Sequence, residues 1–249
     1  MESNWWLNPA MFRTLALIGA GAALALGCSA GGGTVTDRGV WTAGEACPDV
    51  FFVGARGTSQ DPGIGPQLTD VYERFVGVLE PPRDIEAAIY PLDYPADGSL
   101  AGSASVYSDS VAVGVRELLA AVELLGTQCE ASRIVLGGYS QGAHVIAVSD
   151  HTFLEHTNVV AVILLANPVF EPDDPTEKVG TFNPDQGGII SKARIDGPLA
   201  QRTIQICLNG DPVCQFGSLA FWVHSNGYFG ETLDPTADFA AEKVIANLP

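Results

Sequence analysis

The segment RIVLGGYSQGA, residues 133–143, runs from an apolar, β-branched stretch directly into a serine flanked by glycines. Its second half, Gly138-Tyr139-Ser140-Gln141-Gly142, is a G-x-S-x-G pentapeptide, and a helical pattern follows from Ala143. A serine at a tight turn between a strand and a helix has a strained backbone that exposes its hydroxyl, and glycines on either side let the two elements approach. The segment therefore predicts an α/β fold with a nucleophilic Ser140. The backbone N–H of Gln141 would point at an oxyanion from the start of the helix.

Four further runs are apolar and rich in β-branched residues, as the buried strands of a parallel sheet are. The five predicted strands cover residues 50–54, 85–90, 133–136, 159–165 and 203–208. Helices are predicted over residues 103–125 and 235–248. We expect a three-layer α/β/α sandwich with a central parallel sheet of about five strands and no cap domain.

Composition favours one well-buried globular domain. Hydrophobic residues make up 47% of the 249 residues and charged residues 16%, which argues against disorder. There are 12 Lys and Arg against 29 Asp and Glu, a net charge of −17. A chain of this charge repels phosphate backbones and anionic lipids, so we expect no nucleic-acid partner.

The N-terminus has the pattern of a targeting segment. Arg13 precedes an apolar run over residues 15–26, which is followed by small residues up to Ala30. The run is shorter than the roughly 20 residues that span a bilayer. We expect a signal peptide over residues 1–30, a glycine-rich tether over 31–46 and a catalytic domain over 47–249, in a protein that is secreted or attached to the cell envelope. Met1 and Met11 both remain candidate start sites.

Export favours disulfides among the five cysteines. Cys207 and Cys214 flank a turn and can close a local loop, which leaves Cys47 to pair with Cys129. The segment before Cys28 resembles a bacterial lipoprotein signal, in which Cys28 would carry the lipid; cleavage after Ala30 would instead remove it. Both outcomes stay open, and a lipid on Cys28 is the only membrane attachment that we expect.

A nucleophilic serine needs a base that a carboxylate orients, and in one large class of serine hydrolases the chain order is serine, acid, histidine. His224 alone lies far downstream of Ser140, and Asp211 follows the last predicted strand. The other histidines, His144, His151 and His156, are expected on the surface or at helix caps, and Asp173, Asp174 and Asp196 are weaker candidates for the acid. No histidine pair or cysteine cluster has zinc-ligand spacing, so we expect neither a metal nor a cofactor.

These residues together resemble the cutinase family of serine esterases, which includes fungal cutinases, acetylxylan esterases and cutinase-like proteins of actinobacteria. The resemblance runs from Cys47 to the C-terminus and includes the segment ARGT, residues 55–58, after the first predicted strand. It implies an α/β-hydrolase-like fold, a Ser140, Asp211 and His224 triad, and an oxyanion hole at Thr58 and Gln141. The family often has serine at the position of Thr58, and threonine retains both the N–H and the hydroxyl.

We therefore expect a monomeric serine ester hydrolase that acts on short to medium acyl esters, in lipid-like small molecules or polymers. Two alternatives stay open, a carbohydrate deacetylase and a catalytically silent surface lipoprotein. An apolar wall for the acyl chain is expected from residues Val213, Phe216, Leu219, Phe221 and Trp222, although the same side chains could be core. The irregular segment over residues 171–197 is too polar to form an apolar lid, so we expect no strong activation by an oil interface.

Overall fold

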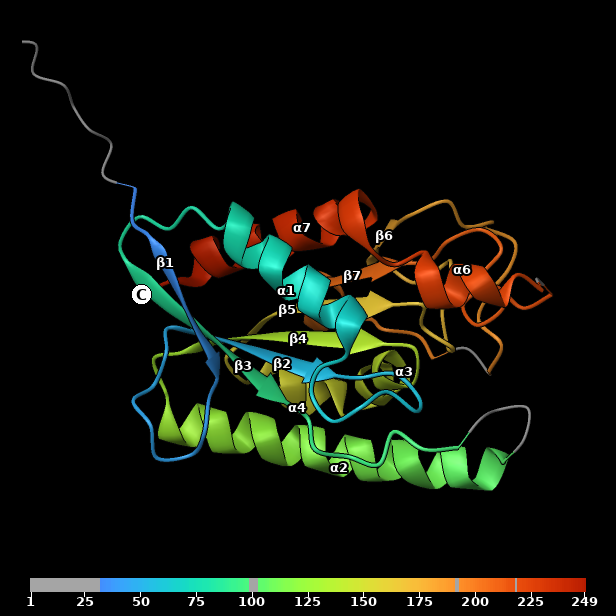
Figure 1. Ribbon diagram of the computed structural model, residues 1–249, viewed down its shortest axis with the longest axis horizontal. Helices are drawn as coiled ribbons and strands as arrows, with labels where there is room; N and C mark the ends of the chain where they lie inside the picture. Colours follow the sequence, from blue (N-terminus) through green and yellow to red (C-terminus); the bar gives the residue numbers. More distant parts are fainter. Residues whose placement is uncertain (1–31, 99–102, 191–192, 218) are drawn as a thin grey trace, which may run out of the picture. The chain divides into compact units, whose positions relative to one another are not determined.

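The computed structural model describes residues 32–98, 103–190, 193–217 and 219–249. The predicted signal peptide and Cys28 lie outside the described residues. The described part of the chain forms one unit around a single sheet, with the strand order β1-β3-β2-β4-β5-β7-β6 and parallel pairing throughout (Figure 1). The strands are β1 (Val35–Val40), β2 (Val50–Ala55), β3 (Ile85–Pro91), β4 (Arg133–Tyr139), β5 (Val159–Leu165), β6 (Glu177–Val179) and β7 (Thr203–Ile206).

The sheet has seven strands, so the expected number of about five was wrong. The five predicted strands form its centre, and the two additional strands, β1 and β6, are its edges. Residues 31–46 were expected to form only a tether, but they contain β1. Val35 of this strand pairs with Ile85 of β3. Both edge strands are polar and partly exposed, since an edge strand is not covered on both sides and needs no continuous apolar run.

Helices cover both faces of the sheet, which confirms the three-layer architecture (Figure 1). On one face lie α1 (Pro66–Val78) and α7 (Asp234–Asn247). On the other lie α2 (Ala104–Gln128), α3 (Gln141–Ala147) and α4 (His151–Glu155). The remaining helices are α5 (Gly197–Ala200), α6 (Phe221–Asn226) and the 3-10 turn η1 (Gly230–Leu233). Between β5 and β7 the described residues contain only β6 and the four-residue α5, and no helical cap.

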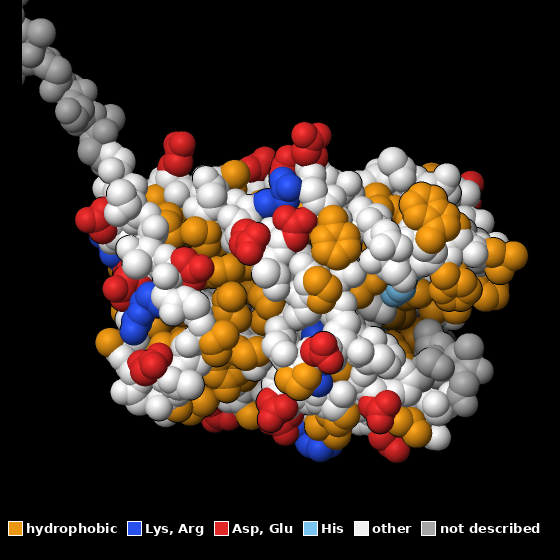
Figure 2. Space-filling model, in the orientation of Figure 1, with side chains coloured by type: hydrophobic (Ala, Val, Ile, Leu, Met, Phe, Trp, Pro, Cys, Tyr) orange, Lys and Arg blue, Asp and Glu red, His pale blue; other side chains and the backbone are white. Residues whose placement is uncertain are grey.

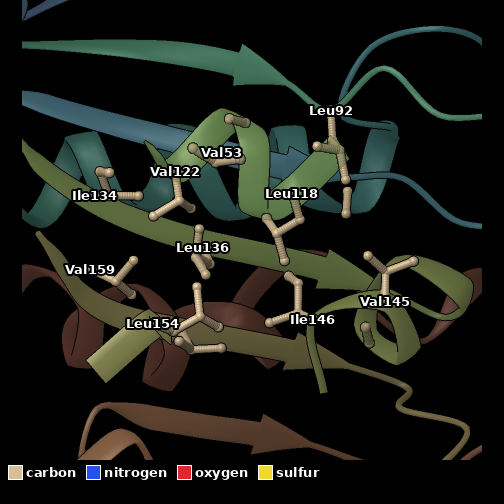
Figure 3. Packing of buried hydrophobic residues seen from close by; sticks show 14 of the residues in the cluster. Val53, Leu92, Leu118, Val122, Ile134, Leu136, Val145, Ile146, Leu154 and Val159 are labelled. Carbon is tan, nitrogen blue, oxygen red and sulfur yellow. The ribbon is translucent and has the colours of Figure 1, made fainter. Parts of the chain in front are cut away.

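Alternation along the strands divides the core into two halves. In β2, Phe51 and Val53 pack toward α2, whereas Val50 and Phe52 pack toward α1 and α7. Figure 3 shows the first half, in which residues of α2, α3 and α4 meet β4 and β5. Because both faces of the central strands are buried, those strands are apolar without interruption, which is why the sequence predicted them.

The strand order places a crevice at the ends of β2 and β4. After β2 the chain continues to β3 on one side, and it then crosses to β4 on the other side. In open parallel sheets, ligands bind at such a switch point, beyond the carboxyl ends of the strands. Thr58 follows β2 and Ser140 follows β4, so the topology brings these two predicted site residues to one place.

Candidate active site

Ser140 occupies a strained turn between β4 and α3. Its φ is +53°, in the left-handed region that non-glycine residues rarely adopt, and its N–H donates to the carbonyl of Leu165 at 2.9 Å. The neighbouring glycines are required by close packing, as predicted. A Cβ on Gly142 would lie 1.8 Å from the carbonyl oxygen of Ala55, and one on Gly138 would lie 2.7 Å from Ala143 backbone atoms.

The structure brings Ser140, His224 and Asp211 together. His224 Nε2 lies 3.0 Å from Ser140 Oγ, and His224 Nδ1 lies 3.1 and 3.0 Å from the two carboxylate oxygens of Asp211. His224 is on α6 and Asp211 follows β7, so three separate segments build the arrangement. A serine, an imidazole and a carboxylate in this order can transfer the serine proton to the imidazole during nucleophilic attack.

Asp211 is fully buried, and three donor groups contact its carboxylate. Besides His224, it accepts from the Tyr228 hydroxyl at 2.7 Å and from the Val213 N–H at 2.8 Å. Such contacts stabilise a buried carboxylate in its charged form. They also restrict it to one orientation toward the imidazole.

Both predicted disulfides are present. Cys207 and Cys214 are joined across the loop that carries Asp211, with their Cα atoms 5.9 Å apart. Cys47 and Cys129 are joined with Cα atoms 5.5 Å apart, which ties the segment before β2 to the end of α2. The first bridge lies beside the site, and the second is at the opposite end of the strands.

Thr58 shares a cavity of about 310 Å³ with Ser140 and His224. Its loop is anchored by Arg56, a buried residue whose guanidinium donates to the carbonyls of Gln60 and Tyr94. The Gly57 N–H donates to the side chain of Gln60 at 2.7 Å. The loop at the predicted oxyanion hole is therefore held by side chains on both sides.

Gln141 is the first residue of α3, where backbone N–H groups have no partner inside the helix. Its side chain is fully buried and serves a separate purpose. Its Oε1 accepts from Ser110 of α2 at 2.8 Å, and its Nε2 donates to the Asp97 carbonyl at 3.0 Å. The Gln141 N–H is thus fixed beside Ser140, and the side chain points away from the cavity into these contacts.

Four residues near the site were not identified from the sequence: Gln60, Gln67, Tyr139 and Tyr228. Gln60 donates to Gln67 of α1 at 2.6 Å, and Gln67 donates to the Ser225 carbonyl at 3.3 Å. This chain of bonds links the Thr58 loop to the segment that carries His224. Local sequence does not mark Gln67, Tyr139 or Tyr228 as site residues, because each bonds a partner 17 to 158 residues away along the chain.

The side chains of the remaining histidines, Asp174 and Asp196 bond partners outside the triad. His151 and His156 bond helix carbonyls, as expected, through contacts to Ala147 and Thr152. His144 is partly exposed, and its ring stacks on Tyr107, whose hydroxyl lies 3.0 Å from His144 Nδ1. Burial lowers the pKa of His144 from 6.5 to about 4.

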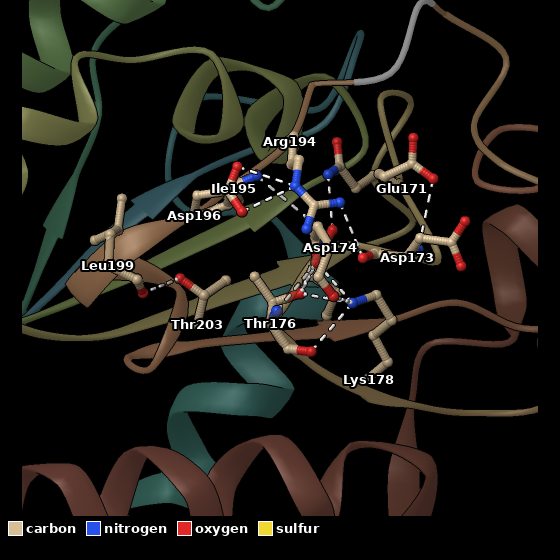
Figure 4. A network of polar contacts seen from close by, with 12 residues as sticks. Glu171, Asp173, Asp174, Thr176, Lys178, Arg194, Ile195, Asp196, Leu199 and Thr203 are labelled. Atoms are coloured by element: carbon tan, nitrogen blue, oxygen red, sulfur yellow. Dashed lines mark hydrogen bonds and ion pairs between the residues drawn. The ribbon is translucent and has the colours of Figure 1, made fainter.

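Asp174 belongs to a separate polar network, in which it accepts from Lys178 at 2.6 Å and from Thr176 and Gln205 (Figure 4). In the same view Asp196 pairs with Arg194, and Arg194 also donates to the Asp173 carbonyl. This network anchors the predicted irregular segment to β7. None of the three acids has a hydrogen bond to His224 among the described contacts.

The described ranges lack both a metal-binding cluster and a membrane-spanning helix. They contain no group of three or more His, Cys, Asp or Glu side chains placed to hold a metal ion. Over the same ranges, no helix is both long enough and apolar enough to cross a bilayer.

Comparison with known proteins gives a consistent family. The cutinase family model matches residues 46–244. Phospholipase Culp4 of Mycobacterium tuberculosis is 30% identical over 210 residues, which cover 81% of each chain. Carboxylesterase Culp1 of the same species is 35% identical over 186 residues, covering 70% of this chain and 71% of the relative.

Solved structures agree on the fold. An acetylxylan esterase superposes with a TM-score of 0.63 at 27% identity, covering 80% of this chain and all of that chain (100%). Trichoderma reesei cutinase superposes with a TM-score of 0.55 at 23% identity, covering 80% and 77%.

Proposed function

The chain belongs to the cutinase family and is a serine ester hydrolase, and from this premise we propose that it cleaves short to medium acyl esters through an acyl-enzyme on Ser140. The observation that carries the proposal is the continuous contact from Ser140 Oγ to His224 Nε2 and from His224 Nδ1 to Asp211. We propose that these three residues are the catalytic triad.

In the proposed mechanism, His224 Nε2 takes the proton from Ser140 Oγ as that oxygen attacks the ester carbonyl carbon. The carbonyl oxygen becomes an oxyanion, which the N–H groups of Thr58 and Gln141 stabilise. The tetrahedral intermediate collapses, the C–O bond to the alcohol breaks, and His224 gives its proton to the leaving alkoxide. Water then repeats the sequence on the acyl-enzyme and releases the carboxylic acid. Asp211 stays ionised throughout and holds the imidazole.

The proposed acyl side of the site is the segment before His224. Between Pro212 and Gly230 the chain has no Asp, Glu, Lys or Arg, in a protein with a net charge of −17. Four large apolar side chains there are exposed, which argues against the core alternative: Phe216 by 66%, Leu219 by 88%, Phe221 by 61% and Trp222 by 69%. Figure 2, in the orientation of Figure 1, shows apolar side chains gathered beside a histidine at the end of the molecule where α6 lies. An apolar wall of this kind favours an acyl chain over a purely polar substrate.

A series of p-nitrophenyl esters from acetate to palmitate, measured above and below substrate solubility, tests the chain-length proposal. Rates should be highest for short to medium chains and should change smoothly across the solubility limit. A sharp increase at that limit, together with a preference for palmitate, would identify a lidded lipase instead.

Carbohydrate deacetylation is the second candidate, favoured by the similarity to an acetylxylan esterase. A deacetylase needs only a small acyl pocket and a polysaccharide groove, and the exposed aromatic side chains beside His224 favour the first candidate over it. Comparison of acetylated xylan with p-nitrophenyl butyrate decides between the two.

A catalytically silent binding protein is excluded if a fluorophosphonate probe labels Ser140. Labelling should disappear in Ser140→Ala and persist in Ser132→Ala, which removes a buried hydroxyl bonded to the Pro48 carbonyl, far from the cavity. Persistent labelling or turnover above about a thousandth of wild type in Ser140→Ala would overturn the assignment.

We also propose that the protein is exported, because residues 13–30 have the pattern of a targeting segment and the fold contains two disulfides. The intact mass of the exported protein tests this and shows whether Cys28 carries lipid or has been removed. A free Cys28 thiol in the exported chain would contradict both outcomes.

A further inference from the structure

We propose that Tyr228 is a positioning residue of the triad, whose hydroxyl holds Asp211 in its ionised form and thereby sets the proton affinity of the Asp211–His224 pair. The inference rests on the proposed function. It concerns a side chain that does not line the cavity at Ser140.

Among the described contacts, Asp211 offers the one strong acceptor for the proton of the Tyr228 hydroxyl. The ring is fully buried, and the hydroxyl oxygen lies 2.7 Å from Asp211 Oδ2. The same oxygen accepts the Leu208 N–H at 3.2 Å. A phenol has a single proton to donate, so with a backbone donor already directed at its oxygen, that proton is left for the carboxylate. The remaining polar neighbour is Cys214 Sγ at 3.4 Å, a disulfide sulfur and a weak acceptor.

Tyr228 remains a donor at any pH where the enzyme would work. Burial, with the neighbouring Asp211 charge added to it, raises the pKa of Tyr228 well above 10. The hydroxyl therefore stays protonated and favours the anionic form of the carboxylate that it contacts.

Besides Tyr228, few groups among the described residues stabilise the charge on Asp211. The titratable groups that face it are His224 from α6, Tyr228 itself, and Tyr139 from the end of β4, whose ring centroid lies 6.1 Å from that of Tyr228. Within the described ranges, His224 is the one basic side chain paired with Asp211. The hydroxyl of Tyr228 and the N–H of Val213 thus supply the remaining stabilisation of the carboxylate.

Removing the hydroxyl should raise the proton affinity of the pair. Without that donor, the Asp211 charge is less dispersed and attracts the proton on His224 more strongly. Because the two groups are coupled, the shift belongs to the pair whichever site holds the proton. The acidic limb of kcat/KM reports this protonation, so it should move to higher pH by about one unit in Tyr228→Phe.

The matched control is Tyr72→Phe. Tyr72 is also a buried tyrosine that donates to a carboxylate, Asp37 Oδ1 at 2.7 Å, but Asp37 lies on the edge strand β1, away from Asp211. Both variants should lower the melting temperature. Only Tyr228→Phe should shift the acidic limb for p-nitrophenyl butyrate and lower its plateau by about five- to tenfold.

The pH dependence of fluorophosphonate labelling is a second readout, which counts only folded molecules and remains usable if Tyr228→Phe is poorly stable. A shifted labelling profile in Tyr228→Phe and an unchanged one in Tyr72→Phe would support the proposal. If Tyr228→Phe loses stability but keeps the wild-type pH profile, Tyr228 is structural only and the proposal is wrong. That result leaves the proposed function intact, whereas turnover by Ser140→Ala would refute the proposed function and this inference with it.

Discussion

Tyr139 stacks its ring on the imidazole of His224, with ring centroids 5.2 Å apart and planes 24° apart, and its hydroxyl donates to the His224 carbonyl at 2.6 Å. The residue directly before the nucleophile thus restrains both the ring and the backbone of the proposed base. Because Tyr139 ends β4 and Ser140 follows it, one strand end positions both groups that exchange a proton. The turnover of each triad variant should therefore depend on whether a base is still present and still oriented toward Ser140.

Substitution of the triad residues should give graded losses of turnover. Asp211→Asn leaves the base present but poorly oriented, whereas His224→Ala removes it, so Asp211→Asn should retain more activity. We expect losses of about 10⁴-fold and about 10⁶-fold in kcat. Steady-state kinetics with p-nitrophenyl butyrate measure both. An Asp211→Asn variant as inactive as His224→Ala would show that Asp211 does more than orient the ring.

The two disulfides should separate stability from activity. Chain entropy assigns about 4.5 kcal/mol to the bridge across 82 residues and about 2.5 kcal/mol to the bridge across 7. The double variant Cys47→Ser with Cys129→Ser should therefore lose more stability but keep its turnover at low temperature. Cys207→Ser with Cys214→Ser should lose turnover first, because Asp211 lies inside that loop. Melting temperatures and kcat values of both double variants test this. The prediction is wrong if the Cys47 and Cys129 variant loses turnover and the Cys207 and Cys214 variant keeps it.

His144 should make the protein less stable in mild acid. Its pKa is about 4 in the folded protein and 6.5 without burial, so between these values the unfolded chain binds more protons. The free energy of unfolding should therefore fall as pH drops from 6.5 to 4, by up to about 3 kcal/mol from this group. Urea unfolding across that range should show a shallower pH dependence in His144→Gln. The exposed His156→Gln serves as control, and equal slopes in all three proteins would contradict the prediction.

The exposed aromatic side chains should matter more as the acyl chain lengthens. Trp222→Ser removes apolar surface beside His224, so KM should increase several-fold for octanoate esters and little for acetate. Val106→Ser, on the exposed surface of α2, is the matched control and should leave both values unchanged. An equal change for acetate and octanoate would indicate that Trp222 does not contact the acyl chain.

Local sequence patterns were sufficient to predict the central strands of the sheet and to select the three proposed catalytic residues. The buried strands are continuous apolar runs because helices cover both of their faces, and Ser140 is marked by glycines that the close approach of β4, α3 and β2 requires. Asp211 and His224 could be selected because few acids and histidines follow the last central strand. Edge strands β1 and β6 escaped prediction, since strands open to solvent carry no such pattern.

The surroundings of those three residues depend on long-range packing. Tyr228 reaches Asp211, Tyr139 reaches His224 and Gln67 reaches the Ser225 carbonyl, across 17, 85 and 158 residues of chain. A hydrogen bond between segments so far apart depends on the packing of whole strands and helices. The sequence around a tyrosine or glutamine does not show whether such a distant partner is present. Local sequence patterns therefore identify which groups can react. The packing of the sheet and its helices sets how those groups are held, because their orientation depends on contacts that no local pattern records.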